Sequence, residues 1–353
     1  MPVSADVFAA GASRQLEVYS TEKPVDQIGH DKPLLKWLIA NKKEALGGQQ
    51  YFNEKVRISY DSNYQNYSGD DQVTYNRRDT VRLAKFPWAN FHDGFALNED
   101  ELAANGIILT DDRQAVATDA EKIQIFNLLT ENMDVLREGV QEKFDYEMHL
   151  DGTQDPKAAQ GLDFLVSTDP TNQTVGGIAT ASATYWRNNT NGPISTATAG
   201  NLTAEMEQTW RDCTRYGQKS IPDLILCGSD FYDAYRKDQN AINQREIIIK
   251  EGGNGGPSID GGTGDLYFRK VLVQWDPSFD ALDDLLGAIT IPWKKRCYFL
   301  NSKTIKLRPL PGHWMVNRKP PRMYDRYLFF WAMTSKYRLT INKRNANAVL
   351  WIS

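Results

Sequence analysis

The sequence is poor in the residues from which metal sites and disulfide frameworks are built. Its 353 residues include only three cysteines and four histidines. The cysteines stand far apart, and no two histidines have the HxH or HxxxH spacing that brings two imidazoles onto one face of a strand or helix. These absences argue against a disulfide framework and a zinc site, and we expect no cofactor.

Long apolar runs are also missing. No stretch approaches the roughly 20 apolar residues needed to cross a bilayer, and the first residues lack the charged start and apolar stretch of a signal peptide. We therefore expect no membrane partner and synthesis in the cytoplasm. The apolar share of 41% is sufficient for a globular core.

Motifs for catalysis are absent as well. The glycine-rich run at 252–264 lacks the order of a phosphate-binding P-loop, and no G-x-S-x-G nucleophile elbow occurs. The tripeptide at 227–229, Cys-Gly-Ser, has no histidine nearby in sequence and is explained by a core cysteine followed by a helix cap. We expect no enzyme, and a hydrolase or transferase without a recognisable motif is the alternative from another class.

What the sequence has in excess is charge of one sign in one segment. Residues 294–344 carry fourteen Lys or Arg and one acid, a net charge of +13, although the whole chain is −4, so the remainder is −17. Such segregation suits a nucleic-acid patch or head-to-tail contacts between identical copies. We favour contacts between copies.

The first third of the chain indicates an arm followed by a hairpin. Residues 1–33 show no sustained period, and a short helix is expected around 34–39, with Gly47 and Gly48 as its stop. Residues 51–60 and 73–86 are β-like and flank a polar turn. A two-stranded ribbon is marginally stable alone, so it needs a surface, either its own domain or a neighbouring subunit.

The clearest helix is predicted over 118–148. Thr118 and Glu121 form a capping-box pattern at its start. One apolar stripe at three- and four-residue steps follows, made of Phe126, Leu129, Met133, Leu136, Val140, Phe144 and Met148. We interpret it as a spine packed on a sheet. Beyond it we expect a compact mixed α/β region from about 153 to 320, and a C-terminal hairpin that returns to the sheet beneath the helix.

The order of these parts resembles the major capsid protein of tailed bacteriophages, the Hong Kong 97-like coat fold, an α+β fold. The segment QGLDFLVSTDPTNQTVGGIATASATYWRNN at 160–189 is similar to a stretch of many phage coat proteins. The likeness there rests on Gly176, Gly177, Ile178, Tyr185, Trp186, Arg187 and Asn188. PDLILCGSDFYDAYRK and KVLVQWDPSFD are further similar phrases, so the resemblance spans nearly the whole chain.

The resemblance implies a division of the chain. Residues 1–50 would be the N-terminal arm and short helix, and 51–95 the extended hairpin loop, or E-loop, that overlies a neighbour. Residues 96–152 with 321–353 would form the peripheral domain with its spine helix at 118–148. Residues 153–320 would form the axial domain.

The implied function is structural. Copies would assemble as pentamers and hexamers of an icosahedral virion capsid, together with a portal protein and possible scaffold and decoration proteins. Packaged DNA would be contacted without sequence specificity. An encapsulin-type shell around a cargo protein is the alternative within the fold. We predict inter-subunit contacts by residues of the hairpin, namely Tyr64, Tyr67, Arg77, Arg78 and Arg82.

Overall fold

A computed structural model describes residues 29–44, 50–98, 100, 119–215, 221–243, 266–287, 289–320 and 328–353. Most of the expected arm and the glycine-rich run at 252–264 lie outside the described residues. The chain divides into two compact units. One contains Phe91–Phe144 and Gly312–Ser335, and the larger contains Asp31–Asn90, Asp145–Pro311 and Lys336–Ser353. Among the described residues, no helix is long and apolar enough to cross a membrane.

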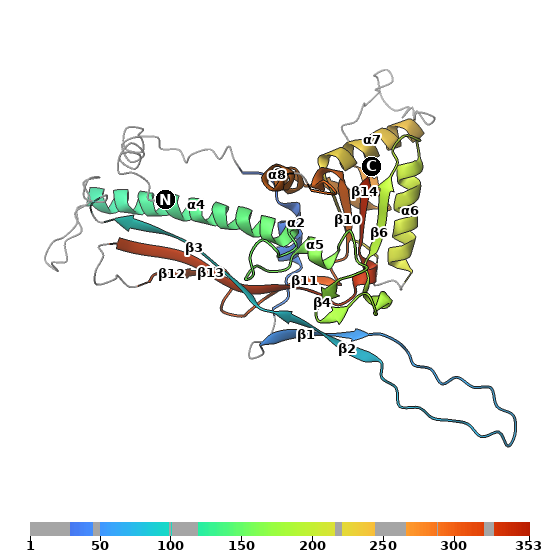
Figure 1. Cartoon of the computed structure of the whole chain (residues 1–353). Helices are drawn as coiled ribbons and strands as arrows, with labels where there is room; N and C mark the ends of the chain where they lie inside the picture. The colour runs from blue at the N-terminus through green and yellow to red at the C-terminus, as the bar shows by residue number, and fades with distance from the viewer. Residues whose placement is uncertain are drawn as a thin grey trace, which may run out of the picture. The chain divides into compact units, whose positions relative to one another are not determined.

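The larger unit is built on a mixed six-stranded sheet (Figure 1). In spatial order its strands are β6 (Asn189–Ile194), β14 (Ala348–Ile352), β10 (Arg296–Leu300), β7 (Leu224–Cys227), β9 (Val271–Trp275) and β8 (Tyr267–Phe268). The β14–β6 and β7–β9 pairs are parallel, and the other three pairs are antiparallel. The central strands β7 and β10 are buried at every position, as expected for strands covered on both faces.

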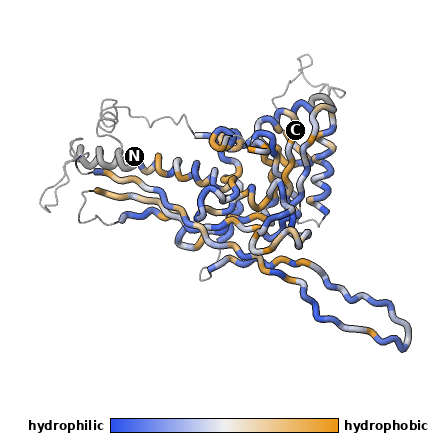
Figure 2. The backbone as a smooth tube through the Cα atoms, viewed as in Figure 1, coloured by the Kyte–Doolittle hydropathy of each residue, from blue (hydrophilic) through white to orange (hydrophobic). Residues whose placement is uncertain are grey.

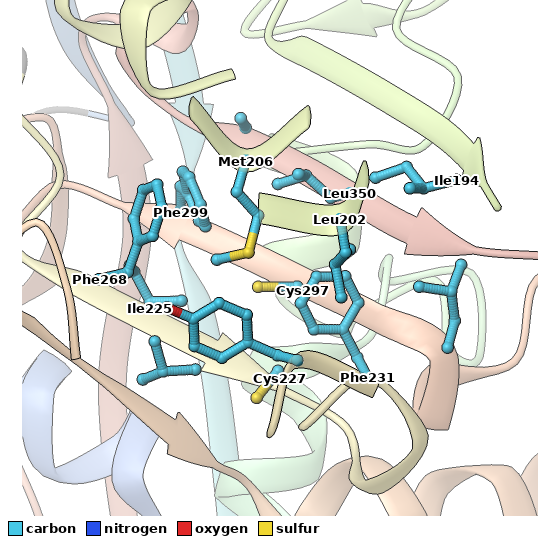
Figure 3. Packing of buried hydrophobic residues seen from close by; sticks show 14 of the residues in the cluster. Ile194, Leu202, Met206, Ile225, Cys227, Phe231, Phe268, Cys297, Phe299 and Leu350 are labelled. Carbon is cyan, nitrogen blue, oxygen red and sulfur yellow. The ribbon is translucent and has the colours of Figure 1, made fainter. Parts of the chain in front are cut away.

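Two helices, α6 (Asn201–Thr214) and α7 (Ser229–Asn243), contribute to the core on one face of this sheet. Figure 3 shows Leu202, Met206 and Phe231 from these helices packed among side chains of the strands. The opposite face holds an aromatic cluster of Phe279, Trp293 and Tyr298. Successive residues of a strand point to opposite faces, so β10 supplies side chains to both layers.

Strands and helices alternate in part of this unit. β7 is followed directly by α7, and β9 by α8 (Pro277–Leu286). The Asp276 side chain caps α8 by accepting a hydrogen bond from the Ser278 N–H at 3.0 Å, and the proline at the first helical position suits that start.

The long helix α4 (Asp119–His149) is present where the apolar stripe predicted it. Thr118 and the side chain of Glu121 lie outside the described residues, so the capping box stays a prediction. In the smaller unit, Leu136 and Val140 of α4 are buried against Met333 of β13 (Leu328–Ile341), together with Phe91 and Phe95. The last two residues come from β3 (Ala89–Asn98), which pairs with β13, as does β12 (Val316–Arg318).

The C-terminal hairpin prediction is wrong. β13 pairs in the larger unit with β11 (Ile305–Pro309), whereas β14 lies between β10 and β6 in the six-stranded sheet. The short helix η4 (Arg344–Ala346) separates β13 from β14 and directs them into different sheets. β14 lies inside the six-stranded sheet because its side chains are apolar on both faces. Every residue of β14 except Trp351 is buried, which requires neighbours on both sides.

Two other boundaries differ from those predicted. Helix α2 (Pro33–Ala40) ends well before Gly47, because the backbone N–H and the side-chain amide of Asn41 both donate to the Trp37 carbonyl. The hairpin has paired strands β1 (Tyr51–Arg57) and β2 (Val81–Pro87), so β2 begins eight residues later than the β-like sequence at 73. Residues 58–80 form an open loop beyond the paired strands (Figure 1).

Candidate inter-subunit contact site

The paired base of the hairpin alternates between a buried and an exposed face. Its antiparallel register sets Phe52 opposite Phe86 and Glu54 opposite Ala84. Val56, Ala84 and Phe86 are buried, whereas their sequence neighbours on each strand are exposed. This period of two is the pattern of a ribbon lying on a surface. The surface belongs to the chain's own larger unit.

Two arginines of that surface contact the base of the hairpin. Arg308 of β11 and Arg338 of β13 stand opposite each other in the ladder, and both are buried. The Arg308 guanidinium lies 2.8 Å from the Glu54 carboxylate and 4.8 Å from the ring centre of Phe52. Arg338 lies 5.9 Å from the ring centre of Phe86 and donates to the side-chain oxygen of Gln160. Each arginine therefore contacts one strand of the hairpin.

A glycine turn supports the other strand from the side. The Lys85 N–H donates to the carbonyl oxygen of Gly176 at 2.8 Å. Gly176 has φ +61°, and a Cβ there would lie 2.9 Å from the Cβ of Ala84. Both the left-handed backbone and the close approach require glycine. The turn joins β4 (Thr174–Val175) to β5 (Ile178–Ala179).

A buried arginine holds this turn to the body of the unit. Arg344 is fully buried and donates to the carbonyl oxygens of Leu165 and Trp186, at 2.8 and 3.0 Å. It also donates to side-chain oxygens of Gln173 and Asn188, at 3.1 and 3.0 Å. Burial lowers the pKa of Arg344 to about 10, which leaves the guanidinium charged at neutral pH. The segment 160–189 thus supplies all four acceptors of the Arg344 guanidinium, and its Gly176 contacts the hairpin at Ala84 and Lys85.

The outer hairpin, defined here as residues 58–76, is open to solvent. Tyr60, Tyr64, Tyr67 and Tyr75 are 71–92% exposed, the largest exposures among the apolar and aromatic side chains of the described residues. The two arms are joined by side-chain hydrogen bonds, in which the Asn63 amide donates to Thr74 and the Thr74 N–H donates to Gln65. Figure 2 shows that this segment is mostly hydrophilic, with few apolar positions. Contacts within its own chain do not explain four exposed tyrosines.

The predicted contact residues all lie between β1 and β2 or in β2 itself. Tyr64 and Tyr67 are near the tip of the hairpin and strongly exposed. Arg77 and Arg78 are exposed and form no ion pair in the described part of the chain. Arg82 differs because its guanidinium lies 3.2 Å from the carboxylate of Asp79, an exposed pair. Nothing in a single chain tests whether these five residues meet a neighbour, so their role stays a prediction.

The basic segment 294–344 is less of a surface patch than its charge suggests. Four of its arginines, Arg296, Arg308, Arg338 and Arg344, are buried in the chain itself. Arg296, for example, lies 2.9 Å from the Asp163 carboxylate and stacks on Trp293 at 4.3 Å. Part of the +13 therefore stabilises this fold internally, and the exposed lysines and arginines of the segment remain for other partners.

One buried cluster contains two aspartates and a histidine. Asp145, His149 and Asp276 are fully buried, and one donor atom from each lies within 4.8 Å of the others. The His149 Nδ1 faces the Asp145 carbonyl oxygen at 2.7 Å, and its Nε2 faces an Asp276 carboxylate oxygen at 3.1 Å. Both ring nitrogens thus face acceptors, which requires two N–H groups and a charged imidazolium.

The pKa of His149 agrees with that assignment. Burial alone lowers it, but the attraction of Asp145 and Asp276 and their hydrogen bonds outweigh burial and raise the pKa of His149 to about 9. In this state both ring nitrogens carry a proton and face acceptors of Asp145 and Asp276. The cluster is therefore a buried ion triad that joins the end of α4 to the start of α8.

All three cysteines are free and buried, and the core position predicted for Cys227 is confirmed. Cys227 and Cys297 face each other in the register of β7 and β10. Burial raises the pKa of both thiols, so neither is a nucleophile at neutral pH. Ser229 donates to the Asp280 carboxylate at 2.8 Å, and no histidine contact to this serine is found among the described residues. The tripeptide at 227–229 has no activated nucleophile.

Comparison with known proteins assigns the fold. No family model and no curated protein sequence matches the chain. Among solved structures, it is similar to the capsid asymmetric unit of cyanophage A-1(L), with a TM-score of 0.59 and 13% identity over 94% of this chain and 96% of that one. The capsid of Myoviridae phage XM1 matches with a TM-score of 0.57 and 12% identity over 97% and 98%. The capsid of the native GTA particle matches with 0.52 and 10% over 97% and 98%.

These matches first define the class of fold, which is a mixed helix and sheet architecture shared along nearly the whole length of both chains. More particularly, it is the capsid fold of phages, the α+β Hong Kong 97-like fold that the sequence analysis predicted. The division into arm, E-loop, peripheral domain and axial domain is not tested and stays a prediction.

Sequence reasoning missed the residues that anchor the hairpin. Glu54, Arg308 and Arg338 are separated by up to 284 positions, and only the pairing of β11 with β13 brings the two arginines together. A usable signal was present, because Arg308 lies between Leu307 and Pro309, and Arg338 between Tyr337 and Leu339. A charged residue inside a buried strand needs a partner, and the acidic residue on the neighbouring ribbon is the natural candidate.

Proposed function

We propose that this chain is a structural capsid protein whose copies assemble into a closed shell, with the hairpin as an arm that contacts a neighbouring copy. The observation that carries the proposal is the match over 94–97% of the chain to capsid proteins that are themselves covered almost completely. The exposed outer hairpin supports the proposal independently. An isolated two-stranded ribbon is only marginally stable, and its four exposed tyrosines are of the residue type enriched at protein interfaces.

The finer proposal concerns the assembly. Pentamers and hexamers would build an icosahedral head around double-stranded DNA, with a portal protein and possible scaffold or decoration proteins as partners. Each subunit holds several neighbours in a closed shell, so modest free energies per contact suffice. DNA contacts would go to the phosphate backbone and weaken with salt. The protein would be made in the host cytoplasm and would reside in the virion.

The decisive experiment is the state of the full chain after expression. Analytical ultracentrifugation and negative-stain microscopy should show particles far larger than the 40.1 kDa monomer. A variant in which residues 60–78 are replaced by a short turn keeps β1 and β2 and should remain folded by circular dichroism without forming particles. A wild-type chain that stays monomeric at every concentration would contradict the proposal.

The content of the particle separates the two kinds of shell. A shell that encloses a cargo protein and no nucleic acid would favour the encapsulin-type alternative, which has the same fold. Particles that protect double-stranded DNA from nuclease after infection would favour the phage head.

A further inference from the structure

A small pocket lies beside the base of the hairpin. It has a volume of about 320 Å³ and is lined by the strand end at 87–90, the loop at 156–158 and Arg338. All these residues belong to the larger unit. This size is at the lower end for binding sites, so the pocket suits a side chain and not a long segment.

Arg338 is the unusual member of the lining. It is only 2% exposed, and its Nε–H has no acceptor among the described residues. Its guanidinium donates to the neutral amide of Gln160 but forms no ion pair in the described part of the chain. Its neighbour Arg308 has the Glu54 carboxylate at 2.8 Å, whereas among the described residues no carboxylate forms an ion pair with Arg338, and Glu147 attracts it without forming one. A buried guanidinium with a free N–H is suited to a planar, charged acceptor.

The rest of the pocket has the same preference. None of its lining residues is acidic. The Lys157 side chain is exposed and has no ion pair in the described region. The ammonium group of Lys336 lies 5.9 Å from the centre of the Trp88 ring, which adds a third cation near the pocket. The chemical class of ligand that this site recognises is a carboxylate.

The outer hairpin offers that group. Residues 58–76 include three aspartates and no lysine or arginine. At the tip, Asp71 is engaged in its own turn, because its carboxylate accepts from the Ser68 N–H and its N–H donates to the Ser68 carbonyl. Asp70 is exposed and has no such partner in the described part of the chain. Asp70 is therefore the carboxylate at the tip that is best placed to bind another group.

A hairpin cannot place this group in its own pocket. Asp70 lies seventeen positions before Pro87, roughly 55 Å of extended chain at about 3.3 Å per residue. Figure 1 shows the loop leading away from the paired strands and not folding back. A pocket that takes the Asp70 carboxylate would therefore belong to another copy.

We propose that Asp70 of one copy enters the pocket of the next copy and pairs with Arg338 and Lys157. The proposal rests on the proposed function, because it names the contact that the hairpin makes in the shell. The contact is head-to-tail, so it repeats from copy to copy and closes a ring when the rotation allows.

Zero-length cross-linking tests the contact without a substitution. Shells assembled from equal amounts of ¹⁴N- and ¹⁵N-labelled full-length chains are treated with a carbodiimide, which joins a carboxylate to an amine only at contact distance. Mass spectrometry should find the Asp70–Lys157 peptide pair with mixed isotope labels. A pair found only with unmixed labels, or a different amine consistently joined to Asp70, would overturn the proposal.

Charge exchange provides the second test. Asp70→Lys and Lys157→Glu should each raise the protein concentration needed for assembly by about tenfold or more, as expected for repulsion at a close charge pair. The double variant restores opposite charges, so the protein concentration that it needs for assembly should fall most of the way back to the wild-type value. Asp61→Lys is the matched control, since it makes the same charge change on the same exposed hairpin.

The outcomes separate the two proposals. An equal effect of Asp70→Lys and Asp61→Lys, or no recovery in the double variant, would overturn the pocket contact while shells still form. A wild-type chain that forms no particles would overturn the proposed function and this contact with it.

Discussion

The Nε2 atom of His149 lies 3.1 Å from a carboxylate oxygen of Asp276, which stands 127 residues later in the chain. With Asp145 on the other side of the ring, the imidazolium is held between two acids in a fully buried site. Ser278 adds a hydrogen bond to the Asp145 carboxylate at 2.5 Å. The arrangement links two segments of the larger unit, the end of α4 and the start of α8, through one proton-dependent charge.

This triad predicts a stability that depends on pH in a defined window. The pKa of His149 is raised from 6.5 to about 9 in the folded chain, so the folded state binds a proton more tightly than the unfolded state. The stabilisation is complete below pH 6.5 and is lost as the pH rises through about 9. Its size should be a few kcal/mol. Thermal unfolding between pH 6 and 10 should show the melting temperature falling across that range.

The variant His149→Gln removes the titrating group and should flatten this part of the pH profile at a lower overall stability. His313→Gln is the control, because His313 is exposed. A wild-type melting temperature that stays constant from pH 6.5 to 9 would contradict a charged His149.

The glycine pair at 176–177 predicts a difference between two otherwise similar substitutions. Both residues have positive φ, so alanine is strained at each, by about 1 kcal/mol. Only at Gly176 would the new Cβ also meet Ala84, at 2.9 Å, whereas nothing lies within 4 Å at Gly177. Gly176→Ala should therefore displace the hairpin base. Hydrogen exchange at the Lys85 amide should become faster in Gly176→Ala and stay near the wild-type rate in Gly177→Ala.

The buried guanidinium of Arg344 predicts a large cost for a conservative change. Lysine keeps the charge but cannot reach the four acceptors that the planar guanidinium contacts. Arg344→Lys should lower the free energy of unfolding by roughly 2–5 kcal/mol, the range for a broken buried network. Denaturant unfolding measures the change, with the exposed Arg215→Lys as a control that should stay within about 0.5 kcal/mol. Equal stability of the two variants would show that the network contributes little.

Local features of the fold were predictable from the sequence, and long-range pairings were not. The stripe along α4 and the strand–helix step at β7 and α7 follow from periodicity within a few turns of chain. The position of β14 depends on which strands leave an open edge, and no local pattern contains that information. A strand that is apolar on both faces fits any sheet interior, so the sequence alone could not choose between the two sheets.

The candidate site shows the same division. The hairpin and its exposed tyrosines could be predicted, because alternation and polarity are local properties. The phrase with Gly176 and Trp186 was recognisable as a resemblance, but its physical reason appears only when Gly176 contacts Ala84 and Arg344 reaches the Trp186 carbonyl. The partner of Glu54 is set by register across 254 residues, which sequence spacing does not reveal.

The ion pair between Glu54 and Arg308 predicts how firmly the hairpin is held. Glu54→Gln leaves two buried guanidinium groups opposite each other, Arg308 and Arg338, without the nearby anion. Because Glu54 is slightly exposed, the cost should be roughly 2–4 kcal/mol, below that of a fully buried pair. Hydrogen exchange of the β1 and β2 amides should rise before that of the six-stranded sheet. Lys55→Gln, on the exposed face of the same strand, is the matched control and should change neither quantity.

A double variant separates the value of the pair from the penalty of an unpaired charge. Glu54→Leu with Arg308→Leu removes both charges and leaves apolar groups beside Phe52, which is often close to neutral for a buried pair. If the double variant regains most of the stability lost in Glu54→Gln, the acid is needed because the arginine is there. If it is no more stable than Glu54→Gln, the pair itself holds the hairpin, and its geometry stabilises the arm that the proposed assembly uses.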